Sequence, residues 1–296
     1  MSFPPLRQRK MKPRFRIANR SRFAAVILVF LLAMTAVLVI IGKSKDQPSQ
    51  GSSVVVTPIV LPTPDPVPTP PPFDIPDGKI MDPVLVVIDA GHGGGDGGTI
   101  SPYVDKFYEK DITLYMAQKV VSLLKDKGID AVLTRDGDYR FSEVNREDLL
   151  TRANIANDNK ASLFVSIHVN AYDISERGGA GVNGMEVYYL NKEEMYTEFD
   201  DKRFAQIIAD EVTKSNGIKF NGIKSNDFSV LRNTKMPAVL VETAYITNKE
   251  DHARLASQEF KDNTAKGIAD GIELTLKEID AFEYEGTMYV FKESGE

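Results

Sequence analysis

The segment Val84–Gly98 constrains the fold more than any other part of the chain, because an uninterrupted apolar run leads directly into a run of glycines. Leu85–Ile88 shows no helical period, and such a run predicts a strand that is buried on both faces. Asp89 follows the strand, and the glycines after it allow the backbone to turn sharply and to approach a bound group closely. In open α/β sheets, ligands bind at loops of this kind, at the carboxyl ends of the strands.

The glycine loop has three interpretations on its own residues. The first is a phosphate-binding loop, but no Gly-Lys-Ser/Thr sequence closes it and its spacing differs from G-x-G-x-x-G. The second is a flexible loop with an incidental histidine. The third is a metal site in which His92 is the first ligand. The residues elsewhere in the sequence are needed to distinguish these three interpretations.

Strands and helices alternate after the loop. Ile112, Met116 and Val120 recur at helical spacing, and Gly128 provides a C-terminal stop. Further helices are expected at Glu147–Asn157, Phe204–Ser215, His252–Ser257 and Phe260–Ile279, and strands at Ile129–Arg135, Leu163–Ile167, Gly184–Leu190 and Ala238–Val241. This alternation predicts an α/β fold: a single domain with a mostly parallel twisted sheet flanked by helices.

Two details of this arrangement also follow from the pattern. In the helix Glu147–Asn157 we expect Leu150 and Ala153 to face inward, because they share one face at helical spacing. We expect the strand Gly184–Leu190 to lie nearer an edge of the sheet than the strands that are apolar throughout.

Four side chains that carry chemistry stand at strand ends or at a helix start. His92 and His168 follow two buried strands, Glu242 directly follows the strand Ala238–Val241, and Glu109 lies at the start of a helix. The carboxyl ends of parallel strands share one edge of a sheet. We therefore expect the two histidines and Glu242 to converge there, with Glu109 reaching the same edge from its helix.

This combination of residues suits metal-assisted hydrolysis. Two neutral imidazoles and one carboxylate make a catalytic zinc site with an open fourth position. Zinc in such a site lowers the pKa of bound water to about 7, and a further carboxylate carries protons from the water to a leaving nitrogen. Zinc-bound imidazoles usually donate their other N–H to a partner, for which Asp89 and Asn170 are candidates. The chain has no cysteine and only three histidines, so thiolate sites, disulfides and a Cys nucleophile are excluded.

Structural alternatives exist for these residues. His168 could be a hydrogen-bonded core histidine, and Glu109 could be a helix N-terminal acid favoured by the helix dipole. A buried Glu242 is costly unless it is paired, and Arg232 is a possible partner. We interpret His252 as a solvated residue, because its neighbours on the helix are charged.

The first 83 residues predict a membrane anchor and a spacer. Residues 1–22 contain eight basic and no acidic residues, and residues 23–41 are apolar and uncharged. As a helix, that span measures about 28 Å, close to the thickness of the bilayer core. The basic arm places the N-terminus in the cytoplasm and the rest of the chain outside. The proline-rich linker, residues 42–83, is expected to be extended.

A cleaved signal peptide is the alternative to the anchor. Its apolar core is usually shorter and ends in an A-x-A type site, which is missing here. From Phe23 onward the chain has 28 basic and 42 acidic residues, and this acidic balance argues against nucleic-acid binding. We assign the catalytic domain to residues 84–281 and a C-terminal tail to residues 282–296. The sequence does not decide whether this tail is a short strand or loose. No wall-binding module and no protein partner can be recognised.

Four motifs together resemble one enzyme family. D-A-G-H-G-G-G-D-G-G, Y-E-K-D-I-T-L, L-F-V-S-I-H-V-N-A and P-A-V-L-V-E-T-A-Y-I-T-N are similar to the zinc-dependent N-acetylmuramoyl-L-alanine amidases of bacterial cell walls. The resemblance covers roughly Leu85 to Leu276. It implies one Zn²⁺ per domain, held by His92, Glu109 and His168, with Glu242 as the catalytic carboxylate.

The resemblance implies a peptidoglycan hydrolase on the wall side of the membrane that cleaves the bond between N-acetylmuramic acid and L-alanine. The loop Thr99–Tyr108 is bulkier than is usual in the family, and it borders the expected site. One alternative is another zinc-dependent wall peptidase with the same metal chemistry. A second alternative is an inactive anchored binding or activating module, against which the intact Glu242 argues.

Overall fold

The computed structural model describes residues 74–296, apart from 193, 194, 197, 295 and 296. The expected basic arm, the apolar span and most of the linker lie outside these residues. Within the described part, no helix is both long and apolar enough to cross a bilayer.

Six strands form the central sheet, in the order β3-β2-β4-β7-β5-β6. They are β2 (Val86–Ala90), β3 (Ala131–Leu133), β4 (Leu163–Asn170), β5 (Met185–Tyr189), β6 (Phe220–Ser225) and β7 (Ala238–Tyr245). Neighbouring strands are parallel except for the pair β5 and β7, which is antiparallel. The predicted α/β domain with a largely parallel sheet is confirmed.

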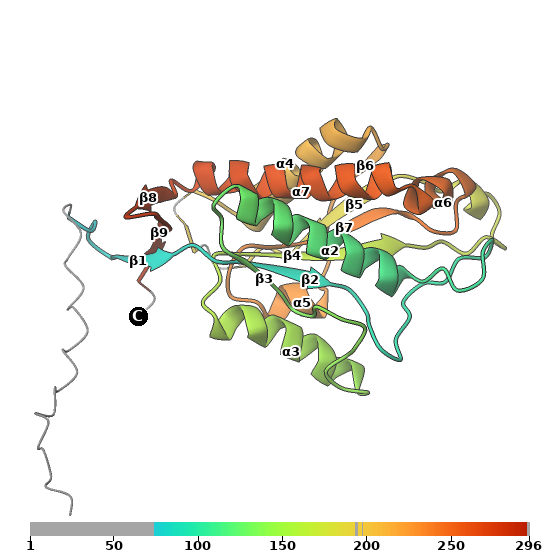
Figure 1. Cartoon of the computed structure of the whole chain (residues 1–296), viewed down its shortest axis with the longest axis horizontal. Helices are drawn as coiled ribbons and strands as arrows, with labels where there is room; N and C mark the ends of the chain where they lie inside the picture. The colour runs from blue at the N-terminus through green and yellow to red at the C-terminus, as the bar shows by residue number, and fades with distance from the viewer. Residues whose placement is uncertain (1–73, 193–194, 197, 295–296) are drawn as a thin grey trace, which may run out of the picture. The chain divides into compact units, whose positions relative to one another are not determined.

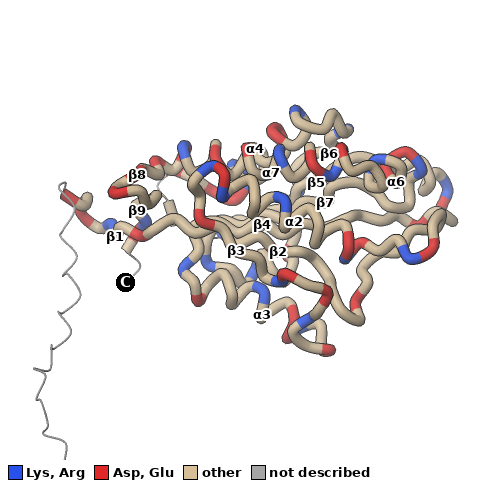
Figure 2. Tube along the Cα trace, in the orientation of Figure 1, with Lys and Arg blue, Asp and Glu red and all other residues tan. Residues whose placement is uncertain are grey.

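Helices cover both faces of this sheet (Figure 1). One face carries α2 (Glu109–Asp126), α4 (Asp201–Asn216) and α7 (Gln258–Glu278), and the other carries α3 (Asn145–Asp158) and the short α5 (Ser229–Asn233). A 3₁₀ turn, η1 (Gly179–Gly181), precedes β5, and α6 (Lys249–Ala256) precedes α7. Charged residues of both signs lie along the helices and the outer loops, whereas the inner strands are almost free of them (Figure 2).

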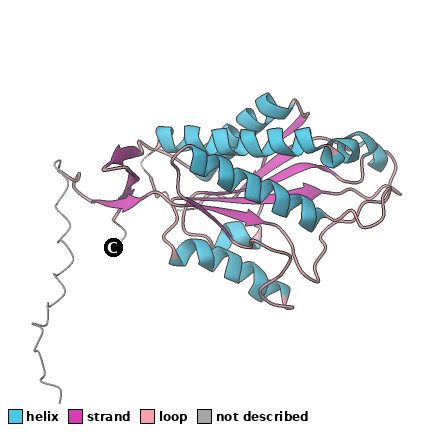
Figure 3. Cartoon of the chain, viewed as in Figure 1, coloured by secondary structure: helices cyan, strands magenta, loops and turns pink. Residues whose placement is uncertain are grey.

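The main core lies between the sheet and the layer of α2, α4 and α7 (Figure 3). Glycine brings α4 and α7 unusually close together. A Cβ at Gly267 would lie 2.5 Å from the Cα of Val212, which is closer than real Cβ atoms come to backbone. A smaller apolar cluster around Phe164 and Leu240 fills the opposite side, under α3 and α5.

Several local expectations differ from the structure. β6 and α5 were not predicted, because they lie in a segment where the sequence shows neither an apolar run nor alternation. β5 lies nearer an edge than β4 and β7, as expected, and β6 is the edge strand beside it. The prediction that Leu150 faces inward is wrong, because its side chain is exposed, whereas Ala153 is buried as expected. The half-buried Leu149 packs on the core in place of Leu150.

A second, smaller sheet joins two distant parts of the chain. β1 (Lys79–Pro83), β9 (Thr287–Glu293) and β8 (Phe282–Tyr284) pair antiparallel, in the order β1-β9-β8. Val290 of β9 is fully buried in the main core. The last residues assigned to the linker and most of those assigned to the tail are therefore ordered parts of the folded unit.

Candidate metal centre

His92 lies in the glycine loop directly after β2, and the loop's own residues fix its imidazole. Its backbone is left-handed, with φ 63°, which is uncommon for a residue with a side chain. Gly93 and Asp96 bridge each other and close the loop. One carboxylate oxygen of Asp96 accepts the N–H of Gly98 at 3.1 Å, and the other lies 2.9 Å from Nδ1 of His92. Nε2 of His92 is thereby left to face the centre of the site.

Two fully buried guanidinium groups hold the backbone of the same loop. Arg152 donates to the carbonyl oxygens of Ala90 and His92, both at 2.7 Å. Arg135 donates to the carbonyl oxygens of Ala90 and Gly91, both at 2.9 Å. The carbonyl oxygens of three consecutive residues therefore point toward the two guanidinium groups. These contacts fix the backbone of His92, from which its imidazole reaches the centre of the site. Neither arginine was predicted to have a role from the sequence.

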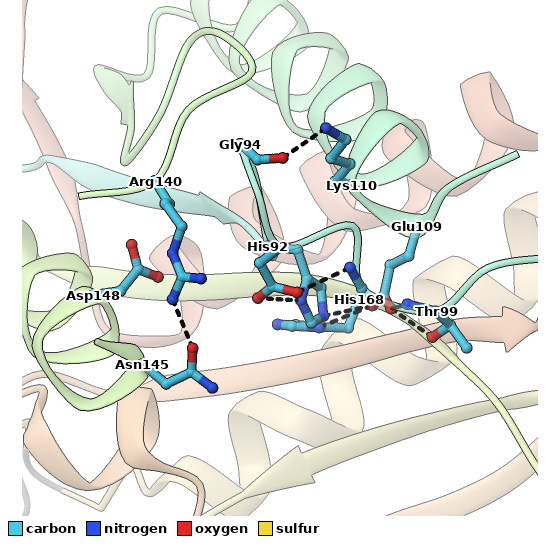
Figure 4. A network of polar contacts seen from close by, with 12 residues as sticks. His92, Gly94, Thr99, Glu109, Lys110, Arg140, Asn145, Asp148 and His168 are labelled. Atoms are coloured by element: carbon cyan, nitrogen blue, oxygen red, sulfur yellow. Dashed lines mark hydrogen bonds and ion pairs between the residues drawn. The ribbon is translucent and has the colours of Figure 1, made fainter. Parts of the chain in front are cut away.

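The three expected ligands meet at one point (Figure 4). One potential ligand atom from each of His92, Glu109 and His168 lies within 4.8 Å of the others. Oε1 of Glu109 lies 3.3 Å from Nε2 of His92 and 3.0 Å from Nδ1 of His168. The two imidazole rings stand nearly perpendicular, with their centroids 4.9 Å apart.

Glu109 is the first residue of α2 and is almost fully buried. Its Oε2 accepts hydrogen bonds from the backbone N–H and the hydroxyl of Thr99, at 2.8 and 2.6 Å. Its Oε1 accepts the N–H of Val169 at 2.8 Å. These bonds fix the carboxylate more firmly than the ordinary helix N-terminal acid that was the alternative.

Two glycines make room for this cluster. A Cβ at Gly91 would lie 2.5 Å from the ring of His168. A Cβ at Gly98 would lie 2.6 Å from Oε2 of Glu109 and 2.7 Å from the ring of His92. The glycines of the loop therefore let the three side chains approach one another.

The partners expected to orient the imidazoles differ from those observed. Asp96 bonds His92, whereas Asp89 accepts hydrogen bonds from Thr134, Ser166 and Arg152 beneath the loop. Asn170 faces Glu186 instead of an imidazole. Asp96 could have been found from its position four residues after His92 in the same short loop.

The charges around the cluster favour a cation at its centre. Burial opposes the charge on Glu109, but the hydrogen bonds from His168 and His92 outweigh it and hold the pKa of Glu109 well below its usual range. Burial also opposes the charge on His92, but Glu109 and Asp96 outweigh it and raise the pKa of His92 to about 9. The buried carboxylate therefore attracts positive charge, which a metal ion can supply in place of a proton.

Glu242 lies on β7 directly opposite His168 of β4. Its Oε2 is inaccessible to solvent and has no hydrogen-bond partner among the described residues. Burial raises the pKa of Glu242 to about 7, against the lowering effect of His168. Arg232 instead bonds Asp227 at 2.6 Å, so the alternative of a Glu242–Arg232 pair is wrong.

The prediction that His252 is solvated is also wrong. Its ring is nearly buried and lies 5.2 Å from the ring of Tyr103 and 4.8 Å from the ring of Phe107. The hydroxyl of Tyr103 donates to the carbonyl oxygen of Thr247 at 2.6 Å. The bulky loop Thr99–Tyr108 thus packs against His252 of α6 through Tyr103 and Phe107.

These residues fit a catalytic metal. Two imidazoles and one carboxylate are the ligand set of a zinc site with an open fourth position, and they converge here with little space for other groups. The carboxylate oxygen of Glu242 that lacks a partner in the described part of the chain suits proton transfer beside such a site. The geometry does not fit a phosphate cradle, because the N–H groups of the loop glycines Gly93, Gly94 and Gly98 already donate to protein oxygens.

The chain was compared with known proteins. The profile of the N-acetylmuramoyl-L-alanine amidase family matches residues 86–274. Among curated proteins, the uncharacterized protein YqiI of Bacillus subtilis is 35% identical over 201 residues, which are 67% of this chain and 89% of YqiI. N-acetylmuramoyl-L-alanine amidase LytC of Bacillus subtilis is 36% identical over 196 residues, which are 65% of this chain and 36% of LytC. This chain thus spans about a third of LytC.

A solved structure is similar as well. The catalytic domain of CwlV, an N-acetylmuramoyl-L-alanine amidase from Bacillus (Paenibacillus) polymyxa var. colistinus, has 37% sequence identity and a TM-score of 0.57. The match covers 66% of this chain and 98% of the CwlV domain.

Gly98→Ala tests whether the glycine loop makes room for the ligands. The added Cβ meets both Glu109 and His92, so we expect zinc affinity to fall at least tenfold, measured by competition with a chromophoric chelator. Gly217→Ala is the matched control, because Gly217 has nearly the same φ, 66° against 63°, and open space around it. Unchanged zinc affinity in Gly98→Ala would contradict this account of the loop.

Proposed function

Because the chain belongs to the N-acetylmuramoyl-L-alanine amidase family, we propose that it is a membrane-anchored peptidoglycan hydrolase whose reaction depends on one zinc ion. Its substrate is the amide bond between N-acetylmuramic acid and L-alanine. The observation that carries the zinc-dependent mechanism is the meeting of His92, Glu109 and His168 at one point, beside the unpartnered carboxylate of Glu242.

Each of these residues has a distinct part in the proposed reaction. His92, Glu109 and His168 would hold zinc, which lowers the pKa of water toward 7 and polarises the scissile carbonyl. Glu242 accepts a proton from the attacking water and returns it to the departing nitrogen of L-alanine. Asp96 keeps the proton of His92 on Nδ1, so that Nε2 faces the metal position.

Analysis of the reaction products tests the substrate bond. Purified peptidoglycan is digested with the catalytic domain, and the soluble fragments are identified by mass spectrometry. The proposal expects free peptides that begin with L-alanine, and glycan strands that keep the lactyl group. Fragments cut within the peptide would instead support the rival zinc-dependent wall peptidase. No fragments from a zinc-loaded sample would support an inactive binding module.

Glu242→Gln separates proton transfer from metal binding. The amide keeps the shape of the side chain but removes the base, so we expect zinc to be retained and kcat to fall by about 10² to 10⁴. Zinc content, melting temperature and turnover are measured on one sample. Asp227→Asn is the control, because this carboxylate is exposed and paired with Arg232. Near-wild-type turnover in Glu242→Gln would remove Glu242 from the mechanism.

The membrane anchor belongs to the same proposal and rests on the sequence of residues 1–41, which lie outside the described residues. The basic arm and the uncharged span support a single-pass protein with its N-terminus in the cytoplasm and its catalytic domain on the wall side. Protease added to cells without their wall should cut the linker and release the catalytic domain. A mature chain that lacks residues 1–41 would show a cleaved signal peptide instead.

A further inference from the structure

Polar side chains of four neighbouring strands form a row from the metal centre to the edge of the sheet. His168 of β4 lies opposite Glu242 of β7, and Glu242 lies opposite Glu186 of β5. Residues directly opposite each other share one face of a sheet. From β6, Nζ of Lys224 reaches Oε1 of Glu186 at 2.6 Å. This polar row, made of His168, Glu242, Glu186 and Lys224, therefore ends in a cation.

The negative charge of Glu186 explains why a cation, Lys224, lies beside it. It does not explain why that cation is exposed to solvent. Like charges directly opposite each other are destabilising, and Glu186 faces Glu242 across the antiparallel pair of β5 and β7. The hydroxyl of Tyr188 donates to one oxygen of Glu186 at 2.6 Å, and that of Tyr245 donates to the other at 2.9 Å. Each oxygen of this buried carboxylate thus has a donor even without Lys224.

Lys224 combines this buried contact with exposure to solvent. Its side chain is 44% exposed, whereas that of Glu186 is 5% exposed. An ammonium group has three donors, and the described residues accept only the one that reaches Glu186. Nζ also lies 6.0 Å from the centroid of the Tyr188 ring, and this half-exposed ammonium group, two strands away from Glu242, has donors left for a bound anion.

Charged side chains of both signs line the cavity at the metal centre itself. A cavity of about 150 Å³ is lined there by the imidazoles of His92 and His168 and by Asp96, with Asp89 and Asp148 paired to the buried Arg152. Lys224 is not among the residues that line this cavity, so an anion bound to Lys224 lies outside it.

We propose that Lys224 is a specificity-determining residue that binds a carboxylate of the stem peptide, so that the peptide runs from the scissile bond across β7, β5 and β6. This inference rests on the proposed amidase function. Neighbouring strands lie about 4.8 Å apart, so the step from β7 to β6 is about 10 Å. An extended peptide covers that distance in about three residues, within the reach of a short stem peptide.

Two synthetic muramoyl tripeptides test the proposal, one with free carboxylates and one with every carboxylate converted to a carboxamide. We expect the wild-type domain to favour the carboxylate form by about 5- to 50-fold in kcat/KM, the range of a single charge-assisted contact. Lys224→Met should abolish most of this preference through KM, and Lys224→Arg should keep it. Salt should weaken the preference in the wild type.

Lys219→Met is the matched control, because Lys219 is an exposed lysine directly before β6 that bonds Asn183 instead of the polar row. The control should keep the wild-type preference. The carboxamide substrate reports on folding, because a purely structural role for Lys224 predicts equal losses on both substrates. Equal losses, or a preference that survives in Lys224→Met, would overturn the inference.

A preference that depends on Arg140, tested as Arg140→Met, would also overturn the inference. Arg140 lies on the other side of the centre and bonds Asn145 at the start of α3. If the wild-type domain cleaves neither tripeptide, the proposed amidase function itself fails. If it cleaves both, only the role of Lys224 is in question.

Discussion

The hydrogen bonds from two buried guanidinium groups to three consecutive carbonyls are the contact on which the rest of the site depends. A buried cation is costly unless its donors are satisfied, and here the carbonyls of Ala90, Gly91 and His92 accept them. The same bonds hold His92 in a left-handed conformation that would otherwise cost about 1–3 kcal/mol. The loop's own contacts thus direct the imidazole of His92 toward Glu109. Such preorganisation is what a catalytic metal site requires of its supporting residues.

Three carboxylates near this centre have different surroundings. Glu109 lies between two imidazoles, which hold its pKa far below the usual range although burial opposes them. Lys224 and the hydroxyls of Tyr188 and Tyr245 likewise outweigh burial and lower the pKa of Glu186. Glu242 has an oxygen without a partner, and burial raises its pKa to about 7. Different environments thus fit one carboxylate to hold a metal, one to organise its neighbours and one to move protons.

The sequence predicted the parts of the fold that depend on local pattern. The apolar runs of β2, β4 and β7 specify central strands, and their shared carboxyl edge brings His92 and His168 together with Glu109. The parts that were missed depend on contacts between distant residues. β1 and β9 are more than 200 residues apart and form strands by pairing with each other, and His252 is buried by a loop about 150 residues earlier in the chain. The roles of Arg135 and Arg152 could not be predicted, because a buried arginine looks like a surface arginine until its partners are known.

The central claim is that His92, Glu109 and His168 hold one zinc ion, and metal content tests it most directly. Zinc is measured by mass spectrometry in the purified wild-type domain and in His168→Ala after both have been dialysed against the same buffer. The account predicts one zinc per wild-type domain and almost none in His168→Ala, because two remaining ligands are too few to retain the ion. Full stoichiometric zinc in a folded His168→Ala domain would contradict the assignment of this site.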